Sequence, residues 1–217
     1  MHASRRSIAL KVRLPWKRPL DLLIGLPLTV GSLPVIGLLA TLVRLGSPGP
    51  AFYLQDRVGC DGAPFRMLKL RTMYHGSDDS THRDAAAAWF AGRAPGDRYK
   101  TLDDSRITPI GRFLRRTNLD ELPQLFNVVR GEMSLVGPRP AVPYELRHYL
   151  PGYFERQCVR PGITGLWQIS ARERLSAAEM MVLDLRYVRE ASPWLDVKIL
   201  ARTAGYALAS LAGETGR

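Results

Sequence analysis

Cysteine and histidine are scarce in this 217-residue sequence, which contains two cysteines and four histidines. Cys60 and Cys158 stand far apart, no CxxC pair occurs, and the histidines are not clustered. Neither a disulfide framework nor a Cys/His zinc site is therefore indicated, and a reducing compartment fits best. The sequence also lacks a Walker A loop, a GxGxxG that opens a helix, an HExxH and a GxSxG, so several familiar enzyme classes drop out.

Acidic residues are also few. The chain has 20 Asp and Glu against 31 Lys and Arg, which gives a net charge of +11. Residues 1–18 contain no acidic residue, and their basic residues are Arg5, Arg6, Lys11, Arg13, Lys17 and Arg18. A basic arm of this kind attracts polyanions, either nucleic acid or the anionic headgroups of a membrane.

A long apolar segment follows the arm and favours the membrane. From Leu20 to Val43 the only charged residue is Asp21. A helix of this length reaches about 36 Å, which is enough to cross a hydrocarbon core of about 30 Å. The stretch is too long and too broken for a signal peptide, and no small-residue cleavage site follows it.

Two features argue against a simple span. Pro34 sits in the middle of the segment, where it removes a backbone donor, and basic residues flank both ends, which marks both ends as cytoplasmic. We therefore predict a re-entrant helix over residues 19–45 that breaks at Pro34, with Ser32 bonding to backbone freed by the break. A single span and a buried soluble hairpin stay open as alternatives. Residues 1–18 are then a basic N-terminal arm and residues 46–217 a cytoplasmic catalytic domain with interfacial helices.

The rest of the chain predicts an α+β fold. Residues 51–59 and 63–73 alternate and are separated by CDG, which predicts a β-hairpin with Lys69 and Arg71 on one face. Residues 74–105 look like a mobile insert, with a short helix and a lid role as the hypothesis. Its aspartate pairs are either metal ligands or ordinary turn and cap residues: Asp78 with Asp79, and Asp103 with Asp104.

Helical patterns dominate the C-terminal half. The spacing of apolar residues from Gly111 predicts an amphipathic helix pair or a bent helix. Residues 177–211 read as two helices joined near Ser192, and the second, which starts near Trp194, is either part of a soluble core or an interfacial helix.

One acidic pair is a candidate for chemistry. Asp120 and Glu121 are adjacent in the run LDELP, among the basic residues Arg112, Arg115, Arg116, Arg130 and Arg139. One carboxylate could act as a nucleophile while the other holds a divalent cation, and the arginines could bind phosphates. The alternative is a capping pair in a first helical turn, with Asn118 as the cap. Arg139 stands between two prolines in GPRP, which pre-organises its guanidinium for a phosphate or makes it part of a rigid turn.

Five motifs, in order, carry a resemblance. They are KRPLDLL, SPGPAFYLQDRVG, FRMLKLRTM, the block RITPIGRFLRRTNLDELPQLFNVVRGEMSLVGPRP, and VRPGITGLWQISAR. With them the sequence resembles the bacterial sugar transferase family, the monotopic polyprenyl-phosphate phosphoglycosyl transferases, over about residues 17–203. The resemblance implies a compact, mainly helical domain with an associated β-hairpin and a re-entrant N-terminal membrane helix. Members commonly have Ser-Pro at the helix break, whereas here Leu33 precedes Pro34 and the serine is Ser32. The chain resembles the minimal catalytic form.

The resemblance also implies an activity and its site. The expected reaction moves a phosphosugar from a UDP-sugar to a polyprenyl phosphate such as undecaprenyl phosphate, with release of UMP, as the first membrane step of surface glycan assembly. Asp120 is the expected nucleophile, and Glu121, with Asp120, the expected ligand of Mg²⁺ or Mn²⁺. The residues expected to bind substrate or phosphate are Arg115, Arg139, Lys69, Arg160 and Gln168. The expected location is the cytoplasmic face of the bacterial inner membrane, and a homodimer is compatible with the resemblance.

Two other readings belong to different classes. A membrane-attached nucleic-acid or scaffold protein would use the net charge but would have no use for Asp120 and Glu121. A metal-dependent phosphohydrolase would use both carboxylates but would need only water as acceptor. We expect the transferase and no nucleic-acid partner. The identity of the sugar, the glycan pathway and the role of the insert do not follow from the residues.

Overall fold

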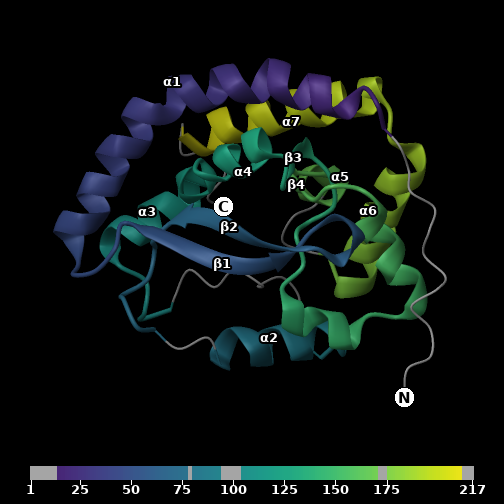
Figure 1. Ribbon diagram of the computed structural model, residues 1–217. Helices are drawn as coiled ribbons and strands as arrows, with labels where there is room; N and C mark the ends of the chain where they lie inside the picture. Colours follow the sequence, from purple (N-terminus) through teal and green to yellow (C-terminus); the bar gives the residue numbers. More distant parts are fainter. Residues whose placement is uncertain (1–13, 78–79, 94–103, 171–174, 212–217) are drawn as a thin grey trace.

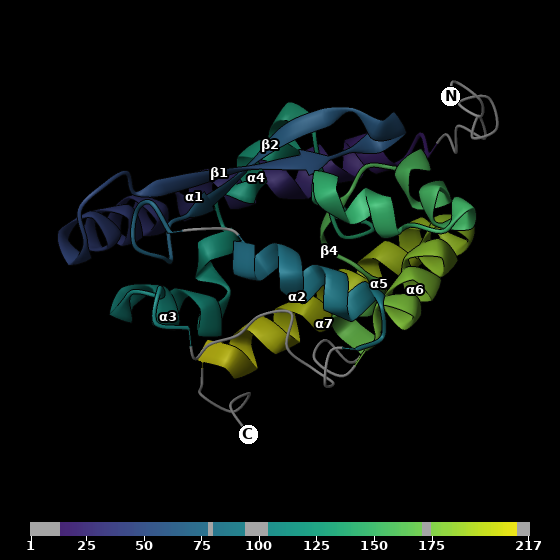
Figure 2. The ribbon, with the colours of Figure 1, turned by 90° about the horizontal axis from the view of Figure 1, so that it is seen from below.

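The computed structural model describes residues 14–77, 80–93, 104–170 and 175–211. Helix α1 (Lys17–Gly46) and helix α7 (Pro193–Leu211) run along one side of the domain, and α2 (Ser80–Phe90) lies on the opposite side (Figure 1, Figure 2). Between these layers lie two small sheets and the remaining helices (Figure 1). The prediction of a mainly helical α+β fold with an N-terminal apolar helix is confirmed. Of the basic arm, residues 1–13 lie outside the described residues.

The predicted hairpin is present. Strands β1 (Phe52–Val58) and β2 (Pro64–Leu70) pair antiparallel, from Phe52 opposite Leu70 to Val58 opposite Pro64. The turn η1 (Cys60–Gly62) places Asp61 at φ 55° and Gly62 at φ +76°, so the DG step supplies the left-handed conformations that the reversal needs. A second, parallel pair is formed by β3 (Ser134–Val136) and β4 (Gly162–Thr164).

Helix α1 does not break at Pro34, and that prediction is wrong. The helix runs unbroken from Lys17 to Gly46 through Pro27 and Pro34, and it curves over the domain (Figure 1). A proline removes one hydrogen bond and clashes with the preceding turn, but bending relieves the clash and the neighbouring turns keep their bonds. Ser32 Oγ donates to Thr29 O at 2.9 Å, which is a bond inside the helix and not a cap on a break.

Helix α1 is apolar and mostly exposed along its middle. It is long and apolar enough to cross a membrane by length and composition, and it keeps residues such as Val30 and Leu38 about 60% exposed. Both of its ends contact the rest of the domain. Near the start, Arg18 donates to Val128 O and Val129 O, each at 2.6 Å, and near the end, Val43 is buried with Leu70 in one cluster.

The core is formed where the hairpin meets the C-terminal helices. Its largest cluster joins β2, β3, α4 (Gln124–Arg130), α6 (Ala177–Glu190) and α7, with Met67, Val128, Leu135, Tyr187 and Ile199 as members. The helices expected over residues 177–211 are therefore confirmed as α6 and α7. The helical region after Gly111 resolves into α3 (Pro109–Thr117), a single 3₁₀ turn η2 (Leu119–Glu121), and α4.

The short helix of the insert is packed against the domain. Phe90 in α2 stacks on His148 of η3 (Pro143–His148) with ring centroids 5.7 Å apart, and Trp89 Nε1 donates to Leu175 O at 3.2 Å. These contacts fasten α2 at its C-terminal end. The lid role stays a prediction, and Asp78, Asp79 and Asp103 lie outside the described residues.

Candidate active site

The acidic pair lies in a tight turn between two helices. Thr108 Oγ1 caps the start of α3 by accepting from Gly111 N at 3.0 Å, and α3 ends at Asn118, which adopts a left-handed conformation with φ 56°. Asp120 and Glu121 follow at once in η2, where the side chain of Asn118 makes no capping hydrogen bond. Asn118 thus stands at the N-cap position with both acids in the first turn of η2, as the alternative expects, but without the capping bond from its side chain. In a 3₁₀ turn, neighbouring side chains point about 120° apart, so the two carboxylates face different surroundings.

Glu121 faces a lysine from the hairpin. Lys69 Nζ lies 3.3 Å from Glu121 Oε1, and the two side chains are 17% and 21% exposed. Strand β2 delivers Lys69 across 52 positions of sequence. An ammonium group at this distance stabilises the carboxylate and holds it in place beside the solvent.

Asp120 is buried beside an arginine. It is 5% exposed, and its negative charge acts on the guanidinium of Arg115. Burial lowers the pKa of Arg115, and the carboxylates of Asp120 and Asp104 act in the opposite direction. Arg115 Nε donates to Thr72 Oγ1 at 2.9 Å, which fixes the side chain. The structure thus brings Lys69, Arg115, Asp120 and Glu121 together from β2, α3 and η2.

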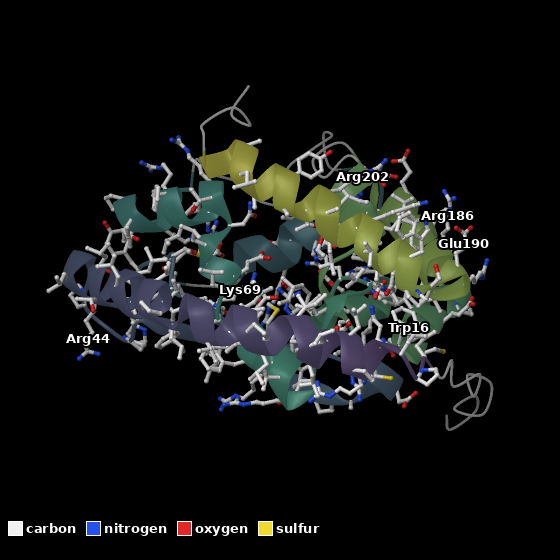
Figure 3. The ribbon with its side chains drawn as sticks, turned by 90° about the horizontal axis from the view of Figure 1, so that it is seen from above. Trp16, Arg44, Lys69, Arg186, Glu190 and Arg202 are labelled. Atoms are coloured by element: carbon white, nitrogen blue, oxygen red, sulfur yellow. The ribbon has the colours of Figure 1, made fainter. Side chains whose placement is uncertain are left out.

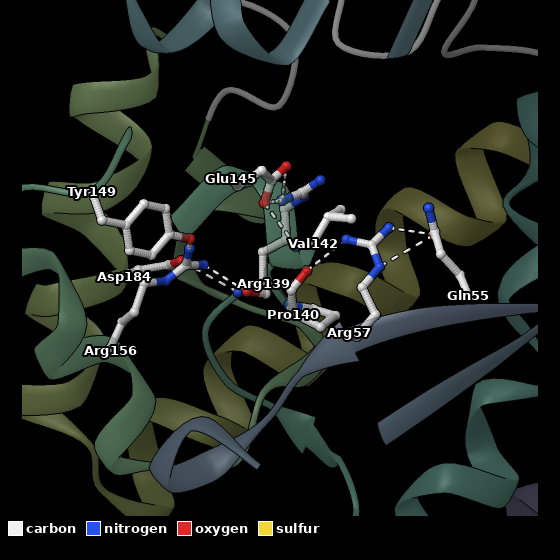
Figure 4. A network of polar contacts seen from close by, with 9 residues as sticks. All are labelled: Gln55, Arg57, Arg139, Pro140, Val142, Glu145, Tyr149, Arg156 and Asp184. Carbon is white, nitrogen blue, oxygen red and sulfur yellow. Dashed lines mark hydrogen bonds and ion pairs between the residues drawn. The ribbon is translucent and has the colours of Figure 1, made fainter. Parts of the chain in front are cut away.

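Arg139 belongs to a second network, which Figure 4 shows in close-up. Its Nη1 donates to both carboxylate oxygens of Glu145, at 3.2 and 3.0 Å, and Glu145 is completely buried. Its backbone is held as well, because Arg139 N donates to Asp184 Oδ2 at 3.3 Å and Arg139 O accepts from Arg156 Nη2 at 2.6 Å (Figure 4). Burial raises the pKa of Asp184 to about 6, and its ion pair with Arg156 limits that rise. Arg139 is therefore fixed through its side chain and through its main chain.

The segments of Arg139 and Arg160 lie side by side and approach each other closely at two glycines. Gly137 N donates to Thr164 O at 2.8 Å, and Gly162 N donates to Pro138 O at 2.9 Å. A Cβ atom at Gly162 would collide with the backbone of Gly137. The close approach of GPRP and RPGITG therefore depends on glycine at these positions.

The other predicted site residues have more local roles in the structure. Arg160 is half-buried and lies just before this close approach of the two segments. Gln168, in α5 (Leu166–Ser170), donates from Nε2 to Ile163 O at 2.9 Å, so its amide fastens its own loop. Ser32 and Pro34 lie inside α1.

Several residues that hold this site were not identified from the sequence. Thr72, Glu145 and Asp184 each fix an arginine, yet none belongs to a recognisable catalytic pattern. For Asp184 the sequence does contain a usable signal, because this acid interrupts the apolar run MMVLDL. Such acids are seldom buried unless they are paired.

The donor set fits a divalent metal that is shared with a substrate. The described ranges contain no group of three or more His, Cys, Asp or Glu residues able to hold a metal. Mg²⁺, however, is commonly bound by one or two carboxylates together with substrate phosphates and water, and Asp120 and Glu121 are ligands of that kind. Asp104 does not look like a ligand, because Arg106 Nη2 lies 2.6 Å from its Oδ2 and the hydrogen bonds from Arg106 lower the pKa of Asp104 to about 2.

Comparison with known proteins places this arrangement in a family. The family model described as bacterial sugar transferase matches residues 12–210. The chain is 41% identical over 198 residues to the UDP-galactose-lipid carrier transferase of Erwinia amylovora, with 88% of this chain and 40% of that protein covered. It is 41% identical over 195 residues to the UDP-glucose:undecaprenyl-phosphate glucose-1-phosphate transferase of Caulobacter vibrioides, with 86% and 67% covered. It is also 40% identical over 192 residues to the exopolysaccharide production protein ExoY of Sinorhizobium fredii, with 86% and 83% covered. Of several longer relatives the chain spans only about 35% to 41% of the length. With a family match over nearly its whole length, the chain belongs to the bacterial sugar transferase family.

Proposed function

We propose that this protein transfers a sugar phosphate from a UDP-hexose to undecaprenyl phosphate at a membrane surface. The observation that carries the proposal is the turn η2, which presents two carboxylates beside Lys69 and Arg115 in a domain built onto an apolar helix. Cations suit a diphosphate donor and a phosphate acceptor, and the apolar helix suits an acceptor confined to a bilayer. The named relatives use UDP-glucose or UDP-galactose with a lipid carrier, which supports the same substrates here.

The proposed reaction has two displacements at one phosphorus atom. A carboxylate oxygen of Asp120 forms a bond to the phosphorus that carries the sugar, the bond from that phosphorus to the bridging oxygen breaks, and the electron pair leaves with UMP. An oxygen of the lipid phosphate then forms a bond to the same phosphorus, and the bond to Asp120 breaks, which restores the carboxylate. Arg115 and Lys69 neutralise charge on the phosphoryl oxygens in both steps.

The metal and the remaining residues complete the proposal. Glu121, with Asp120, would hold Mg²⁺ or Mn²⁺, which when bound supplies charge neutralisation to the diphosphate. Glu121 is already aimed at a cation, because it pairs with Lys69. Arg139, Arg160 and Gln168 are proposed to contact the nucleotide or the sugar. The fixed position of Arg139 supports this, since an immobilised guanidinium loses little entropy when it binds a phosphate.

We propose a re-entrant path for α1 on the cytoplasmic face of the bacterial inner membrane. Both ends of α1 contact the same domain, which supports a helix that enters and leaves one face. Helix α7 lies on the same side of the molecule as α1 (Figure 1), and its exposed apolar residues include Trp194 and Leu208. Lys198, 5.2 Å from the ring of Trp194, suits the level of anionic headgroups. An interfacial role for α7 follows, and a homodimer stays a prediction.

The decisive experiment measures UMP release in lipid nanodiscs with Mg²⁺, with and without undecaprenyl phosphate, across a panel of UDP-sugars. We expect continuous UMP release only with the lipid and only from one or two donors, and a burst of one UMP per enzyme without it. Asp120→Asn should abolish both, and Asp56→Asn, which removes an acid that is 80% exposed on the hairpin, should alter neither. Repeated turnover without lipid would identify a hydrolase, and release that survives Asp120→Asn would reject the nucleophile.

A further inference from the structure

Arg71 is a buried cation held by the end of the membrane helix. It is 5% exposed, and its Nη2 donates to Ser47 O at 2.7 Å, to Ser47 Oγ at 3.0 Å and to Val43 O at 3.4 Å. Its Nη1 donates to Pro48 O. Among the described residues no carboxylate pairs with Arg71, so its partners are almost all main-chain carbonyls at the C-terminal end of α1. These carbonyls carry the negative end of the helix dipole, which stabilises a cation.

The SPGP motif is shaped around this guanidinium. Gly49 has φ +112°, which disfavours any other residue, and a Cβ atom at Gly49 would collide with Arg71 Nη1. Pro48 supplies one acceptor to Arg71. A motif that the proposed chemistry does not use therefore has a physical role, because it wraps the chain that leaves the membrane helix around Arg71.

The residues next to Arg71 reach the candidate active site. Lys69, two positions earlier, pairs with Glu121 at 3.3 Å. Thr72, one position later, accepts from Arg115 at 2.9 Å and is bonded through its carbonyl to Thr108 N at 3.0 Å. Three residues of one short segment thus bind the membrane helix, Glu121 and Arg115.

We propose that Arg71 is a positioning residue that fixes the active site relative to the membrane, so that the lipid acceptor meets the phosphosugar at the right depth. This inference rests on the proposed function. The nucleotide donor arrives from water and does not depend on that depth, whereas the lipid phosphate is confined to the headgroup plane. Loss of Arg71 should therefore impair the second displacement more than the first.

The test compares the two half-reactions of Arg71→Met in nanodiscs. We expect the UMP burst without lipid to stay near that of the unaltered protein, while turnover with undecaprenyl phosphate falls about tenfold to a hundredfold, as for a misplaced reactant, with a raised KM for the lipid. The matched control is Arg44→Met, which removes an exposed arginine from the last turn of the same helix and should keep the ratio of the two rates (Figure 3). Arg71→Lys keeps the charge but cannot bond to the same set of carbonyls. Its ratio of lipid-dependent turnover to UMP burst should lie between the ratios of Arg71→Met and Arg44→Met.

A merely structural role would lower the burst and the turnover by the same factor, and that result would overturn the inference. If Arg71→Met does not fold, Ser47→Ala removes a single acceptor and should change the ratio in the same direction. A labelling measurement tests the inference without any turnover. It still applies if no variant shows a UMP burst, although that outcome would reject the proposed function. Leu45→Cys, at a position 80% exposed near the end of α1, should react with a water-soluble maleimide at an altered rate in Arg71→Met and not in Arg202→Met, which removes an exposed arginine from α7, with Cys60 and Cys158 replaced by alanine. An unchanged rate would refute the positioning role.

Discussion

The buried ion pair between Lys17, at the start of α1, and Asp196 should dominate the stability of the domain. Lys17 Nζ lies 2.5 Å from Asp196 Oδ2 and donates to Tyr187 Oη at 2.6 Å, while the Lys17 and Asp196 side chains are only 5% and 1% exposed. Removing one partner of a buried ion pair costs about 3–5 kcal/mol, because the other charge stays buried. At about 2–4 °C per kcal/mol for a chain of this size, Lys17→Met should lower the unfolding midpoint by roughly 6–20 °C.

The assay is a double-mutant cycle by thermal unfolding at a fixed scan rate in nanodiscs. Lys17→Met, Asp196→Asn and the double variant should be non-additive by about 0.5–3 kcal/mol, since the second substitution removes a charge that the first had stranded. Burial already raises the pKa of Asp196, and loss of Lys17 should raise it further. An acid with a raised folded-state pKa destabilises the fold once it ionises, so Lys17→Met should regain stability as the pH is lowered toward the ordinary pKa of an aspartate.

The control for this cycle is the exposed pair of Arg186 and Glu190 on α6, whose side chains are 59% and 53% exposed (Figure 3). Exposed pairs of this kind contribute about 0–1 kcal/mol, so removing either residue should shift the midpoint little. The buried pair does not hold the helix if Lys17→Met is no more destabilised than Arg186→Met. The same conclusion follows if the losses of stability caused by Lys17→Met and Asp196→Asn are additive.

Four further outcomes follow from the geometry. Gly162→Ala should yield little folded protein in a size-exclusion assay, because its Cβ meets the backbone of the GPRP segment, while an alanine at the exposed Gly152 should not. Glu145→Gln should raise the KM for the UDP-sugar more than it lowers kcat, since losing a charge-assisted bond to Arg139 costs about 1.5–3 kcal/mol; equal changes would argue against positioning. Asp104→Asn should be less stable than the unaltered protein at neutral pH, and in unfolding curves the difference should narrow from pH 4 toward pH 2, because the lowered pKa of Asp104 makes its stabilisation vanish there. Removal of divalent cations with EDTA should stop UMP release, and added Mg²⁺ or Mn²⁺ should restore it; activity that persists would exclude a metal requirement.

Local rules predicted much of the fold. The hairpin follows from alternating residues around a DG step, and the helical pattern over residues 177–211, with its junction near Ser192, corresponds to α6 and α7. The acidic pair was also accessible, because Asp120 and Glu121 interrupt an otherwise apolar run among arginines. Such features depend on residues that are close in sequence, and the sequence displays them directly.

The rest depends on partners that no local pattern reveals. Lys17 and Asp196 are 179 positions apart, and the partners of Arg71 are carbonyl oxygens, which every residue possesses. The break at Pro34 was expected from the proline and from the basic residues at both ends of the segment, but the helix runs unbroken from Lys17 to Gly46, and bending keeps its other backbone groups bonded. Proline in an apolar segment therefore does not by itself decide between a bend and a break.

The anchors of α1 make the membrane helix and the candidate site one mechanical unit. Asp21 Oδ1 accepts from Ser134 Oγ at 2.8 Å and from Leu135 N at 2.9 Å. Both donors lie in β3, the strand that leads directly into GPRP. Arg18 bonds to the last carbonyls of α4, the helix that follows Asp120 and Glu121, and Arg71 ties the other end of α1 to the segment of Lys69. The strand that leads into GPRP, the helix that follows the acidic pair and the segment of Lys69 are therefore each bonded to α1 or to the residues that directly follow it. Because these bonds reach both ends of α1, the domain cannot tilt relative to α1 without breaking at least one of them, and a rigid connection of this kind suits the proposed reaction between a dissolved nucleotide and a membrane-bound lipid.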